Sequence, residues 1–222
     1  MARFARLVAP GYPHHVTQRG VRSMTIFDDD RDRFTYLRYM AEEAERFHVQ
    51  FLGWCLMPNH VHLIAVPARE DSLARAIGEA HRRYTWFKNS TTGVRGYLFQ
   101  GRFHSCVLDQ PHLLVAGRYI ELNPVKARMI KKPQDYMWSS CRYHSGIVDR
   151  DFLILKPVLP ELVGNWINFL DDDGNRETED KVIKGTRTGR PVGDENFVRK
   201  LELATGRILR PKKAGRPRKV KK

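Results

Sequence analysis

Residues 57–66, MPNHVHLIAV, combine an apolar run with two histidines that stand one residue apart. Side chains alternate between the two faces of a β-strand, so His60 and His62 share a face if this run is a strand. Residues 50–56 form a second β-prone run, and Met57, Pro58 and Asn59 between the two runs are typical of a short turn. The pattern predicts a β-hairpin that carries two imidazoles side by side.

The segments that flank this hairpin predict an α+β fold. A strand over residues 14–20 is followed by a helix that starts at the acidic triplet 28–30, since carboxylates suit a helix N-terminus. After the hairpin we expect a helix from residue 71, a strand or bent hairpin over 98–108, and a helix over 111–123. This order favours an antiparallel sheet with helices on its faces over a doubly wound parallel sheet.

The composition changes after residue 143, which predicts three parts: residues 1–145, an accessory region over 146–206, and a basic tail over 207–222. The run from Asp171 to Lys181 is rich in charged and polar residues and reads as a solvated linker. A short helix is expected near the end of the accessory region, capped by Asp194 and stopped at Gly206.

Composition indicates a basic protein with a polyanionic partner. Lys and Arg number 39 against 25 acidic residues, which gives a net charge of +14 and a pI near 10.0. Such an excess is typical of nucleic-acid binding. No apolar run suits a signal peptide or the roughly 20 residues of a membrane span. Three scattered cysteines without a CxxC pair argue against disulfides and suit a reducing cytosol.

The helix over 111–123 adds two polar groups that suit the histidine pair. Tyr119 and Asn123 are four residues apart and therefore share a helix face, and Pro124 predicts that the helix ends or kinks there. Imidazole nitrogens and an amide oxygen can bind a divalent ion, and a tyrosine beside a metal can attack a phosphodiester. Taken singly, the histidines are more simply interpreted as core residues or as polar groups at a strand edge, and Tyr119 as an amphipathic core residue with its hydroxyl at the rim.

Four ordered blocks carry a resemblance to a known family: LMPNHVHLIAVP (56–67), FQGRFHS (99–105), RYIELNPVKARM (118–129) and YMWSS (136–140). Together with GRPVGDENFVRKLE (189–202), they resemble the single-tyrosine transposases of the HUH endonuclease superfamily. The most similar subgroup is the REP-associated tyrosine transposase-like proteins of bacteria. The resemblance implies a ferredoxin-like sheet with His60 and His62 on a central strand, and a bacterial, cytoplasmic, nucleoid-associated protein.

The resemblance also implies roles for the site residues. His60, His62 and Asn123 would bind a divalent ion, Mg²⁺ or Mn²⁺, and Tyr119 would be the nucleophile. Related enzymes often have glutamine at the position of Asn123, so the shorter side chain keeps the amide oxygen but has less reach. The implied activity is cleavage and joining of single-stranded DNA next to hairpins through a 5′-phosphotyrosine intermediate.

Six arginines are candidates for DNA contacts. Arg82 and Arg83 lie in HRRYTWFK (81–88), where cations alternate with rings that could stack on bases or simply fill the core. Arg102 and Arg118 suit phosphate contacts, because a guanidinium can bind phosphate through two hydrogen bonds. Arg216 and Arg218 lie in a tail segment that resembles an AT-hook, although a nonspecific basic tail would look the same.

Other features leave alternatives open. REP-associated members carry an N-terminal Gly-Thr-Pro-Ser-Ala-Arg-like signature, and MARFARLVAPGYPHH (1–15) lacks it, so the sequence does not identify REP hairpins as the target. A homodimer and a monomer both remain open. The rival function is a DNA-binding or regulatory protein that kept the fold and lost the reaction. A replication initiator is a third option, but no helicase domain or extra tyrosine motif accompanies the site.

Overall fold

A four-stranded antiparallel sheet forms the centre of the protein. The computed structural model describes residues 6–172 and 174–210, so Arg216 and Arg218 of the predicted tail lie outside the described residues. The strands are β1 (His14–Arg19), β2 (Val49–Met57), β3 (His60–Pro67) and β4 (His104–Val107), in the spatial order β2-β3-β1-β4. All three pairings are antiparallel. The predicted α+β, ferredoxin-like arrangement is confirmed.

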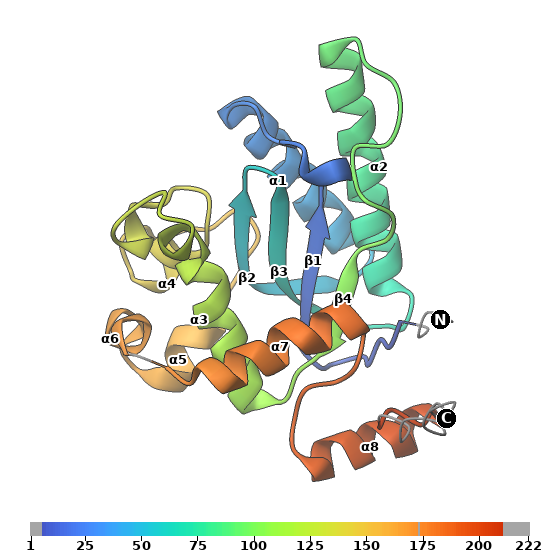
Figure 1. Cartoon of the computed structure of the whole chain (residues 1–222), viewed down its shortest axis with the longest axis vertical. Coiled ribbons are helices and arrows are strands. Elements are labelled where there is room, and N and C mark those ends of the chain that lie inside the picture. Colours follow the sequence, from blue (N-terminus) through green and yellow to red (C-terminus); the bar gives the residue numbers. More distant parts are fainter. Residues whose placement is uncertain (1–5, 173, 211–222) are drawn as a thin grey trace, which may run out of the picture.

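Helices cover both faces of this sheet. α1 (Asp30–Arg46) and α2 (Ser72–Thr92) pack together on one face, while α3 (Gln110–Lys126) and α7 (Arg176–Thr188) lie over the other (Figure 1). The shorter elements are η1 (Val21–Ser23), η2 (Pro133–Asp135), α4 (Cys141–His144), α5 (Val158–Val163), α6 (Trp166–Asp171) and α8 (Glu195–Thr205). In the described part of the chain, no helix is long and apolar enough to span a membrane.

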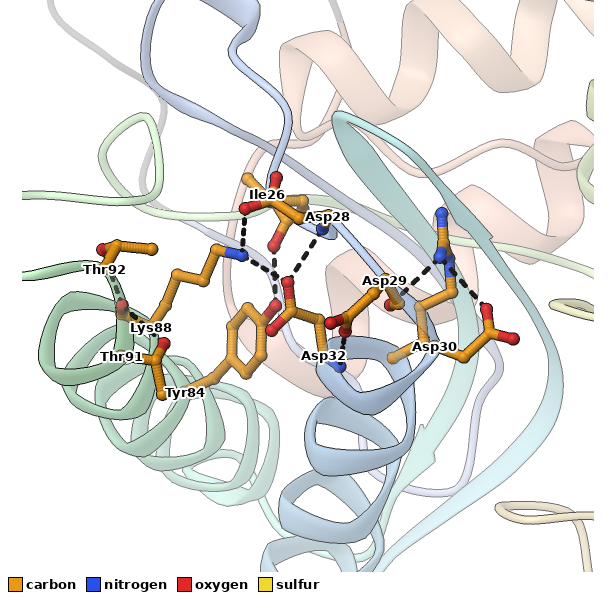
Figure 2. Close-up of polar contacts among 10 residues, drawn as sticks. Ile26, Asp28, Asp29, Asp30, Asp32, Tyr84, Lys88, Thr91 and Thr92 are labelled. Carbon is orange, nitrogen blue, oxygen red and sulfur yellow. Dashed lines mark hydrogen bonds and ion pairs between the residues drawn. The ribbon is translucent and has the colours of Figure 1, made fainter.

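A polar network joins the start of α1 to the end of α2 (Figure 2). Asp29 caps α1 by accepting a hydrogen bond from the backbone nitrogen of Asp32 at 2.9 Å, which confirms the predicted role of the acidic triplet. Lys88, on α2, forms ion pairs with Asp28 (2.7 Å) and with Asp32. The Tyr84 hydroxyl donates to a backbone carbonyl just before α1 at 2.6 Å. These contacts fix the two helices against each other.

The helix that carries the candidate nucleophile is longer than predicted. α3 continues through Pro124 to Lys126, and the next backbone hydrogen bond, from Ala127 nitrogen to the Asn123 carbonyl, is 2.9 Å long. A proline inside a helix removes one intrahelical hydrogen bond, and here the following turn closes normally. Tyr119 and Asn123 therefore stand on one continuous helix.

The expected linker over residues 171–181 is wrong in its second half, because residues 176–181 form the start of α7. Asn175 caps this helix by accepting from the backbone nitrogen of Thr178 at 3.2 Å, and Gly189 ends it in the left-handed conformation. The buried face consists of Val182, Gly185 and Thr186, which pack against β4 and β1. Val182 and Ile183 are the only apolar residues of this helix, so its composition resembles that of a solvated linker.

The C-terminal described segment packs on the N-terminal one. α8 is capped by Asp194 and followed by Gly206 in the left-handed conformation, as predicted. A small hydrophobic cluster joins Leu201 of α8 and Leu209 to Leu7, near the start of the described chain, and to Val107 of β4.

Candidate active site

The two histidines of β3 share one face of the sheet. Their ring centroids are 5.0 Å apart, as the alternation of strand side chains predicts. Val61, between them, is fully buried on the opposite face. On the neighbouring strand β1, Arg19 is the register partner of His60 and Thr17 is that of His62. The strand thus presents two imidazoles beside a row of polar β1 side chains.

α3 brings Tyr119 over this pair. The Tyr119 ring lies edge-on to the His62 ring, with centroids 5.4 Å apart, and 5.9 Å from the His15 ring. Asn123 lies one helical turn further along and donates from its amide to the Tyr119 carbonyl at 3.3 Å. The four residues predicted from the sequence therefore meet in one place. They come from two elements, β3 and α3, and the contacting pair His62 and Tyr119 is 57 positions apart in the sequence.

These side chains line a cavity of about 390 Å³ between the sheet, α3 and α7. Its walls are formed by His15, Thr17, Gln18, Arg19, His60, His62, Gln100, His104, Tyr119, Asn123, Ile183, Thr186 and Arg187. The cavity combines the candidate nucleophile and metal ligands with two arginines. It can therefore hold a charged ligand against Tyr119.

The hydrogen bonds of the two histidines leave one nitrogen of His62 without a partner. His62 Nδ1 lies 3.0 Å from His15 Nε2, while His62 Nε2 is buried and has no hydrogen-bond partner. His60 Nδ1 lies 2.6 Å from the side-chain oxygen of Asn59. In both rings Nδ1 is therefore engaged by the protein, which suits a role for Nε2 as a ligand.

A family model described as "Transposase IS200 like" matches residues 10–123, just over half of the chain. The chain belongs to the IS200-like transposase family. The match takes in all four residues selected above and confirms the resemblance to single-tyrosine HUH transposases. It ends before α7, although α7 supplies part of the cavity wall of this IS200-like transposase.

A solved structure agrees with the fold. The chain is similar to a REP-associated tyrosine transposase bound to a REP hairpin, with a TM-score of 0.55 and 17% identity over 70% of this chain and 92% of that chain. It also aligns with a putative transposase from Deinococcus radiodurans at 15% identity, over 54% of this chain and 96% of that chain, with a TM-score of 0.38. No curated protein sequence matches the chain.

Burial keeps the histidines of this IS200-like transposase neutral. It lowers the pKa of His15 to about 4, and burial together with Arg19 lowers the pKa of His60 to about 4. The pKa of His62 is lowered well below its usual value, first by burial and then by the neighbouring His15, His60 and Arg19. A neutral imidazole is the form that binds a metal ion.

Tyr119 is protonated at neutral pH. Burial raises its pKa above the ordinary phenol value, Glu179 adds to this effect, and a hydrogen bond with Asn123 and the charge of Arg19 oppose it. The phenol therefore needs a further cation or a base before it can act as a nucleophile.

The predicted DNA-binding arginines do not all face the cavity. Arg82 is paired with Glu79 at 2.5 Å on the exposed side of α2. Arg83 is held by Glu42 (2.5 Å) and Glu43 (2.7 Å), so it ties α2 to α1.

The other two described arginines of that set lie in different hollows. Arg118 donates to the Leu170 carbonyl at 3.3 Å and lines a separate cavity beside α3 and α7. Arg102 lines a hollow next to the active cavity, together with His104 and Arg187, which also line the active cavity. Of the four, Arg102 lines the hollow that shares lining residues with the active cavity.

The rings of residues 81–88 divide between the two predicted roles. Tyr84 is fully buried and its ring lies edge-on to the core ring of Tyr36, whereas the side chain of Trp86 is 69% exposed. Tyr97, in the loop after α2, is 93% exposed. The buried ring fills the core, and the two exposed rings remain available for stacking.

Sequence reasoning missed the residues that complete the cavity. His15, Thr17 and Arg19 share one face of the predicted first strand, so a correct pairing of that strand with β3 would have found them. Thr186 and Arg187 lie in α7 and have no local motif. Only the packing of α7 on the sheet brings them to the site.

Proposed function

We propose that this protein is a metal-dependent single-stranded DNA endonuclease and strand transferase that cleaves next to DNA hairpins. The observation that carries the proposal is the Tyr119 ring, 5.4 Å from the His62 ring in a cavity that also holds His60 and Asn123. Transposase function follows from the family. The reaction assigned to these residues is our inference.

The residues present fit a divalent ion, Mg²⁺ or Mn²⁺. The buried and unpartnered His62 Nε2 is the observation that supports it, because a buried polar atom without a partner is energetically unfavourable and a metal ion would satisfy it. Among the described residues no group of three or more His, Cys, Asp or Glu side chains could hold a metal, so the proposed set takes its third donor from the amide of Asn123. His60 completes the set.

The bound ion would withdraw charge from the scissile phosphate and favour the ionised phenol. Tyr119 Oη forms a bond to phosphorus, and the bond from phosphorus to the 3′ oxygen of the preceding nucleotide breaks. The phenol loses one proton and the released 3′ oxygen gains one. The products are a 5′-phosphotyrosine link and a free 3′-hydroxyl, and attack by another 3′-hydroxyl reverses the step and joins strands.

Adjoining hollows support a route for a single strand. Arg187 lines both the active cavity and the neighbouring hollow, and Arg102 lines that hollow and a further one of about 400 Å³ beside α2. The last hollow also contains Arg82 and the exposed Tyr97. Guanidinium groups suit phosphates, and an exposed ring suits an unstacked base. A hairpin substrate is in keeping with the similar transposase that is bound to a REP hairpin.

The test is a covalent adduct. Full-length protein is mixed with labelled single-stranded hairpin DNA that carries a randomised flank, in Mg²⁺, Mn²⁺ or EDTA, and the products are separated on a denaturing gel. We expect an adduct that requires metal, that is absent in Tyr119→Phe and that is present in Tyr143→Phe, a control tyrosine on α4. DNA binding without an adduct in any ion or flank would favour the catalytically inactive DNA-binding protein instead.

A further inference from the structure

A chain of buried polar contacts runs from α7 to β3. The Thr186 hydroxyl lies 2.8 Å from the Val182 carbonyl and 2.7 Å from His15 Nδ1. His15 Nε2 in turn lies 3.0 Å from His62 Nδ1. The exposed fractions of His15, His62 and Thr186 are 1%, 5% and 2%. Because water has almost no access to these groups, the three side chains must satisfy one another.

The direction of these hydrogen bonds can be derived from their first member. Thr186 has one hydroxyl proton, which it donates to the Val182 carbonyl, so its oxygen accepts at His15 Nδ1. His15 then carries its proton on Nδ1, and its Nε2 accepts from His62 Nδ1. Cys106 Sγ, 3.1 Å from the Thr186 oxygen, is at most a weak donor and does not change this direction.

The opposite direction leads to an unfavourable end. If Thr186 donated to His15, His15 would donate to His62, and the His62 proton would sit on Nε2. That nitrogen is buried and has no acceptor, and a buried N–H without an acceptor is costly. The first direction leaves a lone pair there, which is what a metal ion requires.

We propose that Thr186 is a positioning residue that acts through His15 to hold His62 in the Nδ1-protonated tautomer, with Nε2 free for a divalent ion. α7 would then contribute to the metal site although none of its residues belongs to the proposed ligand set. The tautomer does not depend on the reaction, whereas its benefit for metal binding rests on the proposed function.

The orientation of the His60 ring is fixed by a neighbouring residue, Asn59. The Asn59 amide nitrogen donates to the Ser23 carbonyl at 3.2 Å, which turns the Asn59 oxygen toward His60 Nδ1. His60 therefore depends on its sequence neighbour. His62 depends instead on the contact between His15 and Thr186, two residues that are 171 positions apart in the sequence.

The tautomer is tested in the metal-free, full-length protein by long-range ¹H–¹⁵N NMR of labelled histidine, with His62 assigned from a His62→Asn spectrum. We expect the Nδ1-protonated pattern for His62 in wild type and in Thr186→Ser. In Thr186→Val the hydroxyl is lost at nearly constant volume, and the pattern should move toward Nε2 protonation. The matched control is Thr188→Val, because the Thr188 hydroxyl bonds to the Lys184 carbonyl of the same helix without contacting a histidine.

Mn²⁺ affinity, measured by titration calorimetry on the same proteins, gives the second readout. We expect Thr186→Val to weaken binding by about tenfold or more, with Thr186→Ser and Thr188→Val near wild type. An Nε2-protonated His62 in wild type, or an unchanged pattern in Thr186→Val, would overturn the proposal. If the His62 tautomer responds to Thr186→Val as expected, but the protein binds no Mn²⁺ and forms no DNA adduct, then the role of Thr186 and His15 is supported and the proposed function is rejected.

Discussion

The two faces of the sheet use buried polar residues in different ways. Between α1 and α2, Lys88 is paired with Asp28 and Asp32, and Arg83 is paired with Glu42 and Glu43. Between the sheet, α3 and α7, a cavity of about 390 Å³ remains and His62 Nε2 has no partner. On the α1–α2 side, called the closed face here, Lys88 and Arg83 are each held by two carboxylates. On the cavity side, called the open face, His62 Nε2 is left facing a cavity that can admit a ligand. We therefore expect the ion pairs of the closed face to contribute mainly to stability, and the cavity residues of the open face to contribute mainly to the reaction.

The largest effect is expected from Tyr119→Phe on the open face. Loss of the nucleophile should reduce adduct formation by about 10³-fold or more, because no other group in the reaction replaces it. The free energy of unfolding should change little, since the hydroxyl is the only group removed and the ring contacts with His15 and His62 remain. Urea unfolding beside the gel assay checks both parts. A large loss in the free energy of unfolding would show that the Tyr119 hydroxyl stabilises the fold.

Lys88→Met is the corresponding change on the closed face. It leaves the Asp32 carboxylate buried and unpaired, which should cost about 3–5 kcal/mol in the free energy of unfolding. Lys126→Met removes the more exposed pair with Glu179 and should cost about 0–1 kcal/mol. Equal losses in urea unfolding for the two variants would contradict the distinction between buried and exposed pairs.

The pH dependence of stability tests the closed face through His81. Burial lowers the pKa of His81 to about 3 from 6.5, and its Nε2 lies 3.0 Å from the Tyr36 hydroxyl. In the unfolded chain His81 binds a proton below about pH 6.5, whereas in the folded chain it stays neutral down to about pH 3. The free energy of unfolding therefore falls as the pH drops through this window.

Between pH 7 and pH 4.5 this residue should contribute a loss of about 2–3 kcal/mol, measured by urea unfolding at both values. His81→Gln keeps a polar side chain that does not titrate, so it should show a smaller loss over the same interval. An identical loss in the two proteins would rule out His81 as a source of the acid sensitivity.

The smallest expected effect concerns DNA affinity. Arg187→Ala should weaken single-stranded DNA binding several-fold and reduce the salt dependence by about one phosphate contact, because Arg187 lines the active cavity and the adjoining hollow. Arg83→Ala should leave DNA binding unchanged, since its guanidinium is held by two carboxylates between α1 and α2. Fluorescence anisotropy at several salt concentrations distinguishes the two. A larger effect from Arg83 would place the DNA on the closed face.

Local rules were enough for much of the fold and for the faces on which the four central residues lie, whereas the roles expected of these residues came from the resemblance to the transposase family. The period of two in residues 60–66 places His60 and His62 on one face, and the spacing of four places Tyr119 beside Asn123. The caps at Asp29 and Asp194 were also predictable, because a capping side chain bonds to a backbone group only three residues away.

The sequence by itself thus determined the strands of the sheet, the helices α1, α2, α3 and α8, and which residues of β3 and α3 share a face. The tertiary structure alone decided which further residues complete it. His15, Thr186 and Arg187 reach the cavity only because β1 pairs with β3 and α7 packs across the sheet. α7 escaped prediction because its buried face includes Gly185 and Thr186, residues of low helix propensity and little apolar area. Hydrogen bonds between residues so distant along the chain depend on how whole elements pack, and no local pattern records that.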